Sequence, residues 1–227
     1  MHTLILFDID GTLTRGGPAK VAFETAMVET YGTAGAVESY DFSGKTDPQI
    51  ARELLMAAGL EDAVIDAGFA GLWDRYIGEI ESHISENPMR LLPGVASLVE
   101  ALDSEPDVAL GLVTGNIIRG ARVKLGSVGL SEYFEVGAYG SDHEVREYLP
   151  AIALERAFEA WGVRFPPESA VIVGDTPRDV ECGKHVGART VAVATGRIPR
   201  EQLEATGADA IFDDFSDIAS VIEALLP

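Results

Sequence analysis

The fold is decided by the stretch Leu4-Ile5-Leu6-Phe7-Asp8-Ile9-Asp10-Gly11-Thr12-Leu13-Thr14. Its first four residues are apolar, which favours a short strand buried on both faces of a parallel sheet. Ligands of open α/β sheets bind beyond the carboxyl ends of the strands, so we expect Asp8 and Asp10 at the mouth of a site. Side chains two apart on a strand point to the same side, where both carboxylates can reach one metal ion or phosphate. The alternative is a solvated turn that merely ends the strand, because Asp and Gly are ordinary turn residues.

From Leu91 onward, strand and helix patterns alternate along the chain. The expected strands are 108–112, 134–138, 170–173, 190–194 and 210–212, and the expected helices are 117–125, 149–161, 178–186, 200–206 and 216–225. Such alternation is typical of βαβ units around a parallel sheet. The sequence therefore predicts the α/β class, with a Rossmann-like parallel sheet flanked by helices.

The segment that follows the first strand has a different character. Apolar residues recur at helical spacing over about 18–31, 46–59 and 64–80, and no strand pattern interrupts them. Two of these helices begin at a proline, a residue that suits the first turn. We therefore expect a helical domain over residues 17–88, inserted into a core domain formed by residues 1–16 and 89–227.

The charge balance restricts the kinds of partner. Seventeen basic residues stand against 37 acidic ones, which gives a net charge of -20. This charge repels nucleic acid and anionic membrane surfaces, so neither is an expected partner. It also opposes an anionic substrate, so a phosphate site in this chain needs a bound cation and a few well-placed basic groups.

Composition also indicates the compartment. The 227 residues include 47% hydrophobic residues, enough for a sizeable core. The single cysteine, Cys182, cannot form an intrachain disulfide and fits a reducing compartment. No apolar run approaches the length of a membrane span, and the run before Asp8 is too short for a signal peptide. We expect a soluble, cytoplasmic protein.

Two later stretches repeat the pattern of an apolar strand followed by polar residues. Thr114, Gly115 and Asn116 follow the strand at 108–112, where a hydroxyl and helix-start N–H groups can bind an anion. The alternative role of Thr114 and Asn116 is to cap the following helix. Asp175 ends the strand at 170–173, and Asp179 follows it at the start of the next helix. Either aspartate can also act simply as a partner of the helix dipole.

These stretches carry a resemblance to a known family. The segment from Asp8 to Thr14, the strand end at Thr114 and the run Gly174-Asp175-Thr176-Pro177-Arg178-Asp179 resemble the first, second and fourth motifs of the haloacid dehalogenase-like hydrolase superfamily. The resemblance extends to helical-cap members such as phosphoglycolate phosphatases, and it identifies residues 17–88 as the cap. Three acidic or hydroxyl-bearing strand ends in the correct chain order are far more specific than any one of them.

The resemblance implies roles for these residues. Asp8 would be the nucleophile and Asp10 the general acid and base, while Thr114, Gly115 and Asn116 would bind the phosphate. Asp8, the Asp10 main-chain carbonyl and Asp175 would bind Mg²⁺. Asp179 would support the metal from its outer shell. A cluster of carboxylates without a cation is mutually repulsive, which independently favours a hard metal ion.

Two basic residues complete the implied site. The family's third motif supplies a Lys or Arg, but the usual Lys-Pro pair is absent. Of the basic residues between Asp142 and Gly174, only Arg146 lies in the loop before a helix, so it takes this role. Lys124 and Lys184 are the next candidates. Lys45, in the cap segment from Phe42 to Asp47, resembles a residue by which related caps approach substrate, and a solvated loop lysine is the alternative.

The expected function is therefore Mg²⁺-dependent hydrolysis of a small phosphorylated metabolite through an aspartyl-phosphate. A phosphosugar mutase of the same superfamily keeps both aspartates and stays open as an alternative, as does a non-catalytic binding protein on the same fold. Dehalogenases and phosphonatases of the superfamily lack the second aspartate, so Asp10 argues against both. The protein is expected to be a monomer or a homodimer, with no nucleic acid or membrane partner.

Overall fold

The computed structural model describes residues 3–226. Its core is a six-stranded sheet in the order β5-β4-β1-β6-β7-β8, and every pairing within it is parallel. The strands are β1 (Thr3–Phe7), β4 (Val108–Thr114), β5 (Val136–Tyr139), β6 (Ala170–Gly174), β7 (Arg189–Val193) and β8 (Ala210–Phe212). The predicted α/β class and parallel sheet are confirmed.

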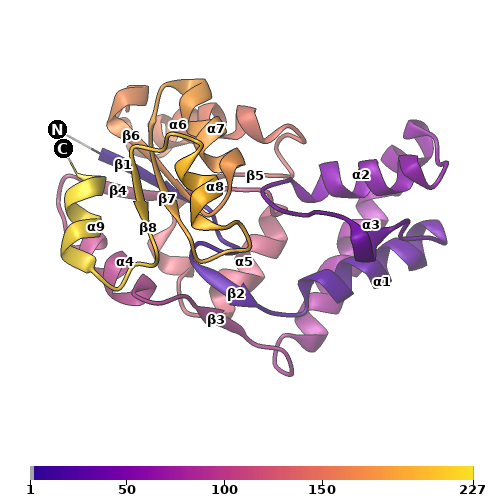
Figure 1. The fold of residues 1–227 in the computed structure, drawn as a ribbon. Helices are drawn as coiled ribbons and strands as arrows, with labels where there is room; N and C mark the ends of the chain where they lie inside the picture. Colours follow the sequence, from indigo (N-terminus) through magenta and orange to yellow (C-terminus); the bar gives the residue numbers. More distant parts are fainter. Residues whose placement is uncertain (1–2, 227) are drawn as a thin grey trace.

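Helices cover both faces of this sheet (Figure 1). They are α4 (Val95–Asp103), α5 (Ile118–Ser127), α6 (Leu149–Trp161), α7 (Pro177–Val186), α8 (Arg200–Glu204) and α9 (Ile218–Leu225). Alternation along β1 explains the two layers: Ile5 and Phe7 belong to the apolar cluster with α4, α5 and α9, whereas Leu4 and Leu6 belong to the cluster with α6. All four side chains are completely buried, as expected of a central parallel strand.

The inserted helices form a second block beside the core, on the right in Figure 1. They are α1 (Ala19–Tyr31), α2 (Asp47–Ala57) and α3 (Asp62–His83). This block has its own apolar cluster, which includes Met27, Leu55 and Leu72 and also takes in Ile117 of the core. We call α1–α3 and their loops the cap. Its expected boundaries at residues 17 and 88 stay a prediction.

A small antiparallel ribbon joins the cap to the core. It pairs β2 (Thr14–Gly16) with β3 (Met89–Leu91), the segments immediately before and after the cap. The remaining helices are short 3₁₀ turns at Val37–Ser39, Ser131–Tyr133, Arg146–Tyr148 and Pro167–Ser169. Within residues 3–226, no helix combines the length and the apolar character required to cross a bilayer.

Candidate active site

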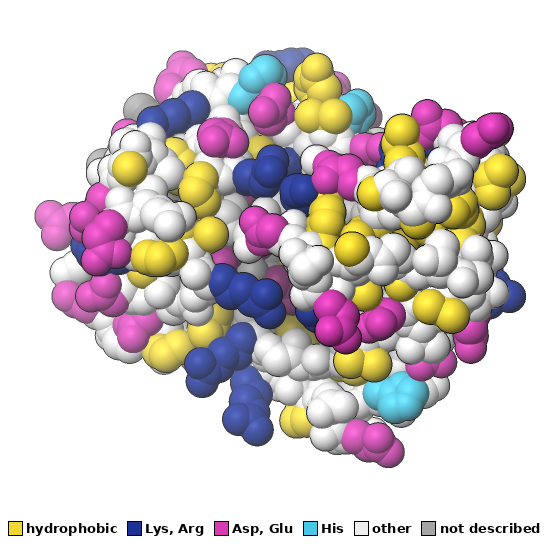
Figure 2. Space-filling view, turned by 45° about the vertical axis from the view of Figure 1, so that its right-hand side comes forward, with side chains coloured by type: hydrophobic (Ala, Val, Ile, Leu, Met, Phe, Trp, Pro, Cys, Tyr) yellow, Lys and Arg dark blue, Asp and Glu magenta, His cyan; other side chains and the backbone are white. Residues whose placement is uncertain are grey.

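The order of the strands brings three distant parts of the chain together. β4, β1 and β6 are neighbours in the sheet, so Thr114, Asp8 and Asp175 meet at the carboxyl edge where these strands end. All three border a pocket of about 520 Å³ that also reaches Asp10 and Arg146. The pocket opens between the core and the cap, where Figure 2 shows a hollow. The site predicted at this edge thus exists as a single concave surface.

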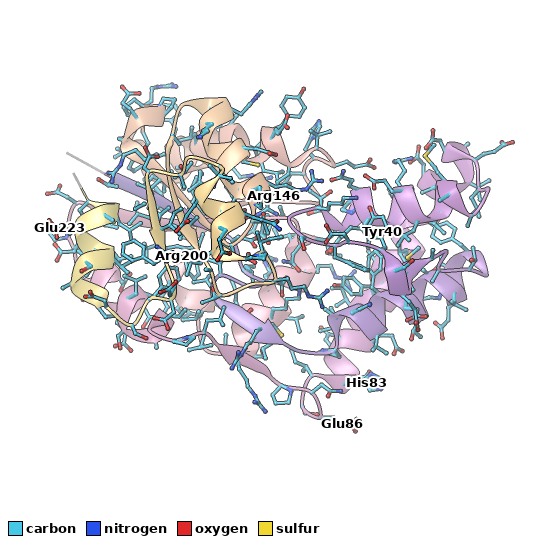
Figure 3. All side chains as sticks on the ribbon, viewed as in Figure 1. Tyr40, His83, Glu86, Arg146, Arg200 and Glu223 are labelled. Atoms are coloured by element: carbon cyan, nitrogen blue, oxygen red, sulfur yellow. The ribbon has the colours of Figure 1, made fainter. Side chains whose placement is uncertain are left out.

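Arg146 lies at the inner end of this pocket. Its guanidinium Nη2 is 3.0 Å from Asp8 Oδ1 and 2.6 Å from Asp179 Oδ1, and it also donates a hydrogen bond to the carbonyl of Val113. The Arg146 side chain is only 5% exposed. Figure 3 places it at the side of the core that faces the cap. The basic residue assigned to the third motif is therefore in contact with the expected nucleophile.

Burial dominates the electrostatics of Asp8. Desolvation raises the pKa of its carboxyl from 3.8 to about 6, although the Arg146 guanidinium opposes the shift. Burial would lower the pKa of Arg146, but Asp179 and Asp8 together raise it further, so this side chain stays charged. A positive charge from a bound cation would similarly favour the ionised, nucleophilic form of Asp8.

Asp175 occupies a space that two glycines leave open. A Cβ on Gly11, whose φ is +90°, would lie 2.3 Å from Asp175 Oδ2, and a Cβ on Gly196 would lie 1.7 Å from the same oxygen. Thr12 donates a hydrogen bond to Asp175 Oδ1 at 3.3 Å. A side chain at either position would displace the Asp175 carboxylate, and the positive φ of Gly11 also favours glycine there.

The carboxylates fit a metal ion. One oxygen from each of Asp8, Asp175 and Asp179 lies within 4.8 Å of the other two, and all three residues are buried. Burial, followed by the charges of Asp179 and Asp8, raises the pKa of Asp175 well above its ordinary value. The Nε of Arg146 is buried with no hydrogen-bond partner among the described residues. Arg146 offsets only part of the repulsion among the three carboxylates, and hard oxygen donors of this kind suit Mg²⁺.

Asp179 also has a structural role at the start of α7. Its Oδ2 accepts hydrogen bonds from the backbone N–H and the hydroxyl of Thr176, at 3.0 and 2.7 Å, which completes a capping box. The two sequence interpretations of Asp179, as a helix-start residue and as a support for the acidic site, are therefore compatible.

Asp10 is held from two sides by core residues. Its Oδ2 accepts hydrogen bonds from Asn116 Nδ2 at 2.8 Å and from Lys124 Nζ at 2.5 Å. Lys124 also donates to Asn116 Oδ1 at 2.6 Å, and Asn116 donates to the hydroxyl of Thr114 at 2.9 Å. The Lys124 side chain is 4% exposed, whereas that of Asp10 is 45% exposed and faces the pocket. This network fixes the position of a carboxylate that remains accessible.

Asp47, the first residue of α2, contacts the backbone at the start of α5. Asp47 Oδ2 accepts a hydrogen bond from the backbone N–H of Ile117 at 2.9 Å, and the Asp47 N–H donates to the carbonyl of Gly115 at 2.7 Å. A Cβ on Gly115 would lie 2.1 Å from the carbonyl oxygen of Lys45, so only glycine permits this approach. Asp47 thus binds the N–H of the residue before α5, the Ser141 hydroxyl accepts the N–H of Ile118 at 3.1 Å, and the Asn116 side chain contacts Asp10 instead.

The other predicted basic residues lie in different surroundings. Lys45 borders the pocket, but its ammonium is 2.7 Å from both Glu53 and the hydroxyl of Tyr40, so its charge is paired within the cap. Its role in substrate binding stays a prediction. Lys184 lies outside the pocket, where it donates a hydrogen bond to the carbonyl of Thr206. Lys124 therefore lies in the site together with Arg146, and Lys184 does not.

Sequence patterns alone did not identify Asp47 as a residue of the site, and they gave Lys124 only as the next candidate after Arg146 for the third motif. Lys124 lies near the end of a helix, a position that usually faces solvent, and here it is buried with its ammonium against Asp10 and Asn116. Asp47 lies in the segment that resembles a substrate-approach loop, and that resemblance was the one available signal.

Comparisons with known proteins show the family and the fold. The model of the family described as haloacid dehalogenase-like hydrolase matches residues 5–193. A phosphoglycolate phosphatase of Rhodobacter capsulatus is 29% identical over 98% of each chain. An N-acetylmuramic acid 6-phosphate phosphatase of Pseudomonas putida is 28% identical over 98% of this chain and 96% of its own. A hydrolase structure from Pseudomonas syringae covers both chains completely, with a TM-score of 0.75 at 20% identity.

Proposed function

Because this chain belongs to the haloacid dehalogenase-like hydrolase family, we propose that it is a Mg²⁺-dependent phosphatase of a small phosphomonoester, acting through an aspartyl-phosphate. One observation carries the proposal. Asp8, Asp10, Thr114 and Asp175, which the sequence separates widely, border one pocket at the carboxyl edge of the sheet. A nucleophile, an acid and base, a phosphate-binding hydroxyl and metal-binding oxygens are the groups that phosphoryl transfer requires.

The first step transfers the phosphoryl group to the protein. An Asp8 oxygen attacks phosphorus, the bond to the ester oxygen breaks, and Asp10 gives its proton to the leaving oxygen. In the second step Asp10 takes a proton from a water that attacks the same phosphorus. Inorganic phosphate leaves, and the Asp8 carboxylate is regenerated. Asn116 and Lys124 hold Asp10 in place during both proton transfers.

Fixed positive charge and N–H groups stabilise the transferred phosphoryl oxygens. Arg146 lies against Asp8, and Thr114, Gly115 and Asn116 line the same pocket, where the Thr114 hydroxyl and the backbone N–H groups would bind the phosphate. Asp8, the Asp10 carbonyl and Asp175 would bind Mg²⁺, with Asp179 in its outer shell. When bound, Mg²⁺ supplies positive charge that offsets both the carboxylates and the phosphate.

The test is release of inorganic phosphate from a panel of phosphorylated metabolites and an aryl phosphate, with Mg²⁺ and after chelation. Relatives of this chain are named for phosphoglycolate and for N-acetylmuramic acid 6-phosphate, so both compounds belong in the panel. We expect metal-dependent release from at least one compound. Undiminished activity after exhaustive removal of divalent metal would refute the Mg²⁺ mechanism.

Matched variants separate hydrolysis from the alternatives. Asp8→Asn should abolish phosphate release, whereas Asp213→Asn, which changes an exposed carboxylate outside the pocket lining, should not. Transfer of labelled phosphoryl groups to a second substrate hydroxyl, faster than release to water, would indicate a mutase. Tight binding of a phosphomonoester with no turnover under any metal would indicate a binding protein.

A further inference from the structure

Tyr76 brings a hydroxyl group to the pocket from the cap. It belongs to α3 and lines the same cavity as Asp8 and Asp10, although only 2% of the residue is exposed. Within residues 3–226 its hydroxyl has no hydrogen-bond partner, and it is not sealed from solvent as the unpartnered Thr30 hydroxyl is. A phenol O–H is a good donor, so this group is satisfied by whatever enters the pocket.

The ring of Tyr76 is held by packing where the cap meets the core. Phe23 packs edge-on against it, with ring centroids 5.3 Å apart at 89°, and the Trp73 ring lies 6.4 Å away. On the core side, a Cβ on Gly120 of α5 would lie 3.9 Å from Tyr76 Cε1. Packing rather than a hydrogen bond therefore fixes the hydroxyl, an arrangement that suits a group whose partner is a ligand.

The hydroxyl of Tyr76 lies on the side of the pocket that holds Asp10. Burial, followed by the charges of Asp47 and Asp10, raises the pKa of Tyr76 well above its ordinary value. Both carboxylates are therefore close enough to act on the phenol, yet neither accepts a hydrogen bond from it. The phenol keeps its proton and serves as a neutral donor beside the proposed acid and base.

One oxygen of Asp10 is left free for proton transfer. The hydrogen bonds from Asn116 and Lys124 both end on Oδ2. Within residues 3–226, Oδ1 has no partner, and the side chain faces the pocket. Oδ1 is thus the atom that exchanges a proton with the ester oxygen. An oxygen that reaches Oδ1 also comes within the neighbourhood of the Tyr76 hydroxyl.

We propose that Tyr76 donates a hydrogen bond to the ester oxygen that departs with the alcohol, as a second donor beside Asp10. The inference rests on the proposed phosphatase function and adds to it a catalytic residue from the cap. As Asp8 attacks, the bond from phosphorus to the ester oxygen breaks, and Asp10 Oδ1 gives its proton to that oxygen. The Tyr76 O–H bond stays intact, and its hydrogen bond strengthens as negative charge develops on the oxygen.

The surroundings of Tyr76 make such a hydrogen bond effective. Phe23, Phe42 and Ile50 line the same pocket from the cap. Apolar neighbours lower the local dielectric constant, so a hydrogen bond to a developing charge is stronger there than in water. Because Tyr76 belongs to α3, the donor is in place only while the cap rests on the core.

The test compares Tyr76→Phe with wild type on phosphate esters of graded leaving groups, from 4-nitrophenol to simple alkyl alcohols. A poor leaving group develops more charge on its oxygen and depends more on the donor. Tyr76→Phe should lower kcat/KM about tenfold for an alkyl phosphate and less than about twofold for 4-nitrophenyl phosphate. An equal loss on every ester, or no loss on the alkyl phosphates, would overturn the inference.

Tyr31→Phe provides the matched control within the cap. The Tyr31 hydroxyl donates a hydrogen bond to the Ile65 carbonyl at 2.6 Å and lies outside the pocket lining. This variant should lower the melting temperature and change all esters by the same factor. Tyr76→Phe removes a hydroxyl without a partner, so its melting temperature should not fall. Destabilisation equal to that of Tyr31→Phe, with equal losses on all esters, would show that the role of Tyr76 is structural.

A binding measurement separates this inference from the phosphatase proposal. In an Asp8→Asn background with Mg²⁺, titration calorimetry compares an alkyl phosphate with the phosphonate in which CH₂ replaces the ester oxygen. The ester should bind more tightly, and Tyr76→Phe should reduce that preference about fivefold. If wild type hydrolyses no ester but this effect is seen, the phosphatase mechanism fails and the hydrogen bond stands. If esters are hydrolysed and Tyr76→Phe changes neither preference, the inference alone fails.

Discussion

Substitution of Asp47 by Asn offers a quantitative test of how the cap docks on the core. Burial, with contributions from Asp10 and Asp8, raises the pKa of the Asp47 carboxyl from 3.8 to about 6, against the opposing effects of Lys124 and the Ile117 N–H. This shift corresponds to about 3 kcal/mol of preference for the neutral form in the folded protein. Asp47 keeps some contact with solvent at the pocket, so we expect about 1–3 kcal/mol.

The raised pKa of Asp47 determines which protein, wild type or Asp47→Asn, is the more stable at each pH. Well below pH 3.8 the carboxyl is neutral in both folded and unfolded chains, and Asp47→Asn should be nearly as stable as wild type. As the pH rises from 3.8 to about 6, the unfolded chain releases the Asp47 proton while the folded chain retains it, so wild type loses stability that the variant keeps, and the loss is complete above about pH 6. The amide oxygen of Asn can still accept a hydrogen bond from the Ile117 N–H, so this contact between the cap and the core is kept in the variant.

The assay is denaturant unfolding of metal-free protein at several pH values between 5 and 8. The difference in free energy of unfolding should favour Asp47→Asn, increase up to about pH 7 and then level off. Asp213→Asn, whose side chain is 83% exposed, is the control and should show no such pH dependence. A variant less stable than wild type at pH 8, or a difference independent of pH, would refute the reasoning.

Four further substitutions test the site. Arg146→Ala should lower the free energy of unfolding of metal-free protein by about 3–5 kcal/mol, because it leaves buried carboxylates unpaired. Added Mg²⁺ should restore part of the lost stability. Arg156→Ala, at a half-exposed position, should lower the free energy of unfolding far less in the same denaturation assay. Asp8→Asn should abolish turnover without lowering the melting temperature in a thermal scan, because burial already favours its neutral form. Lys124→Met should reduce kcat at least tenfold with less effect on KM, as expected of a group that positions the acid and base, and Lys124→Arg should recover part of the rate. Lys45→Ala should change the ranking of substrates in a phosphate-release panel more than it changes activity on an aryl phosphate. Equal losses of activity on all substrates would contradict a substrate-contacting role for Lys45.

The sequence was sufficient to predict the sheet and the residues at its edge because both depend on local patterns. Each central strand is a continuous apolar run, and each ends at the polar residue that borders the pocket. The family resemblance and the α/β class are confirmed. The ribbon escaped prediction because strands of three residues carry too little periodicity, and α4 was not specified at all.

The groups that hold Asp10 and close the site could not be predicted from local patterns. The contact of Lys124 with Asp10 joins residues 114 positions apart, and Asp47 has its partner, the Ile117 N–H, only because the cap rests on the start of α5. Arg146 is an intermediate case: its loop could be identified, but the contact with Asp8 depends on how β5 and α6 place that loop beside β1. Such contacts arise from tertiary packing, which a single sequence does not display.

A short series of hydrogen bonds connects the cap to Asp10, the proposed general acid and base. Asp47 accepts a hydrogen bond from the N–H of Ile117. The residue before Ile117 is Asn116, whose side chain donates a hydrogen bond to Asp10. Opening of the cap would break the Asp47 contact and expose that carboxylate to water, which returns its pKa toward 3.8 and favours its ionised form. Closure must therefore overcome the cost of burying this charge, and cations at the pocket lower that cost. A substrate or metal that changes the field beside Asp10 would thus shift the cap equilibrium as well as the chemistry, through Asp47 rather than through a direct contact with the cap helices.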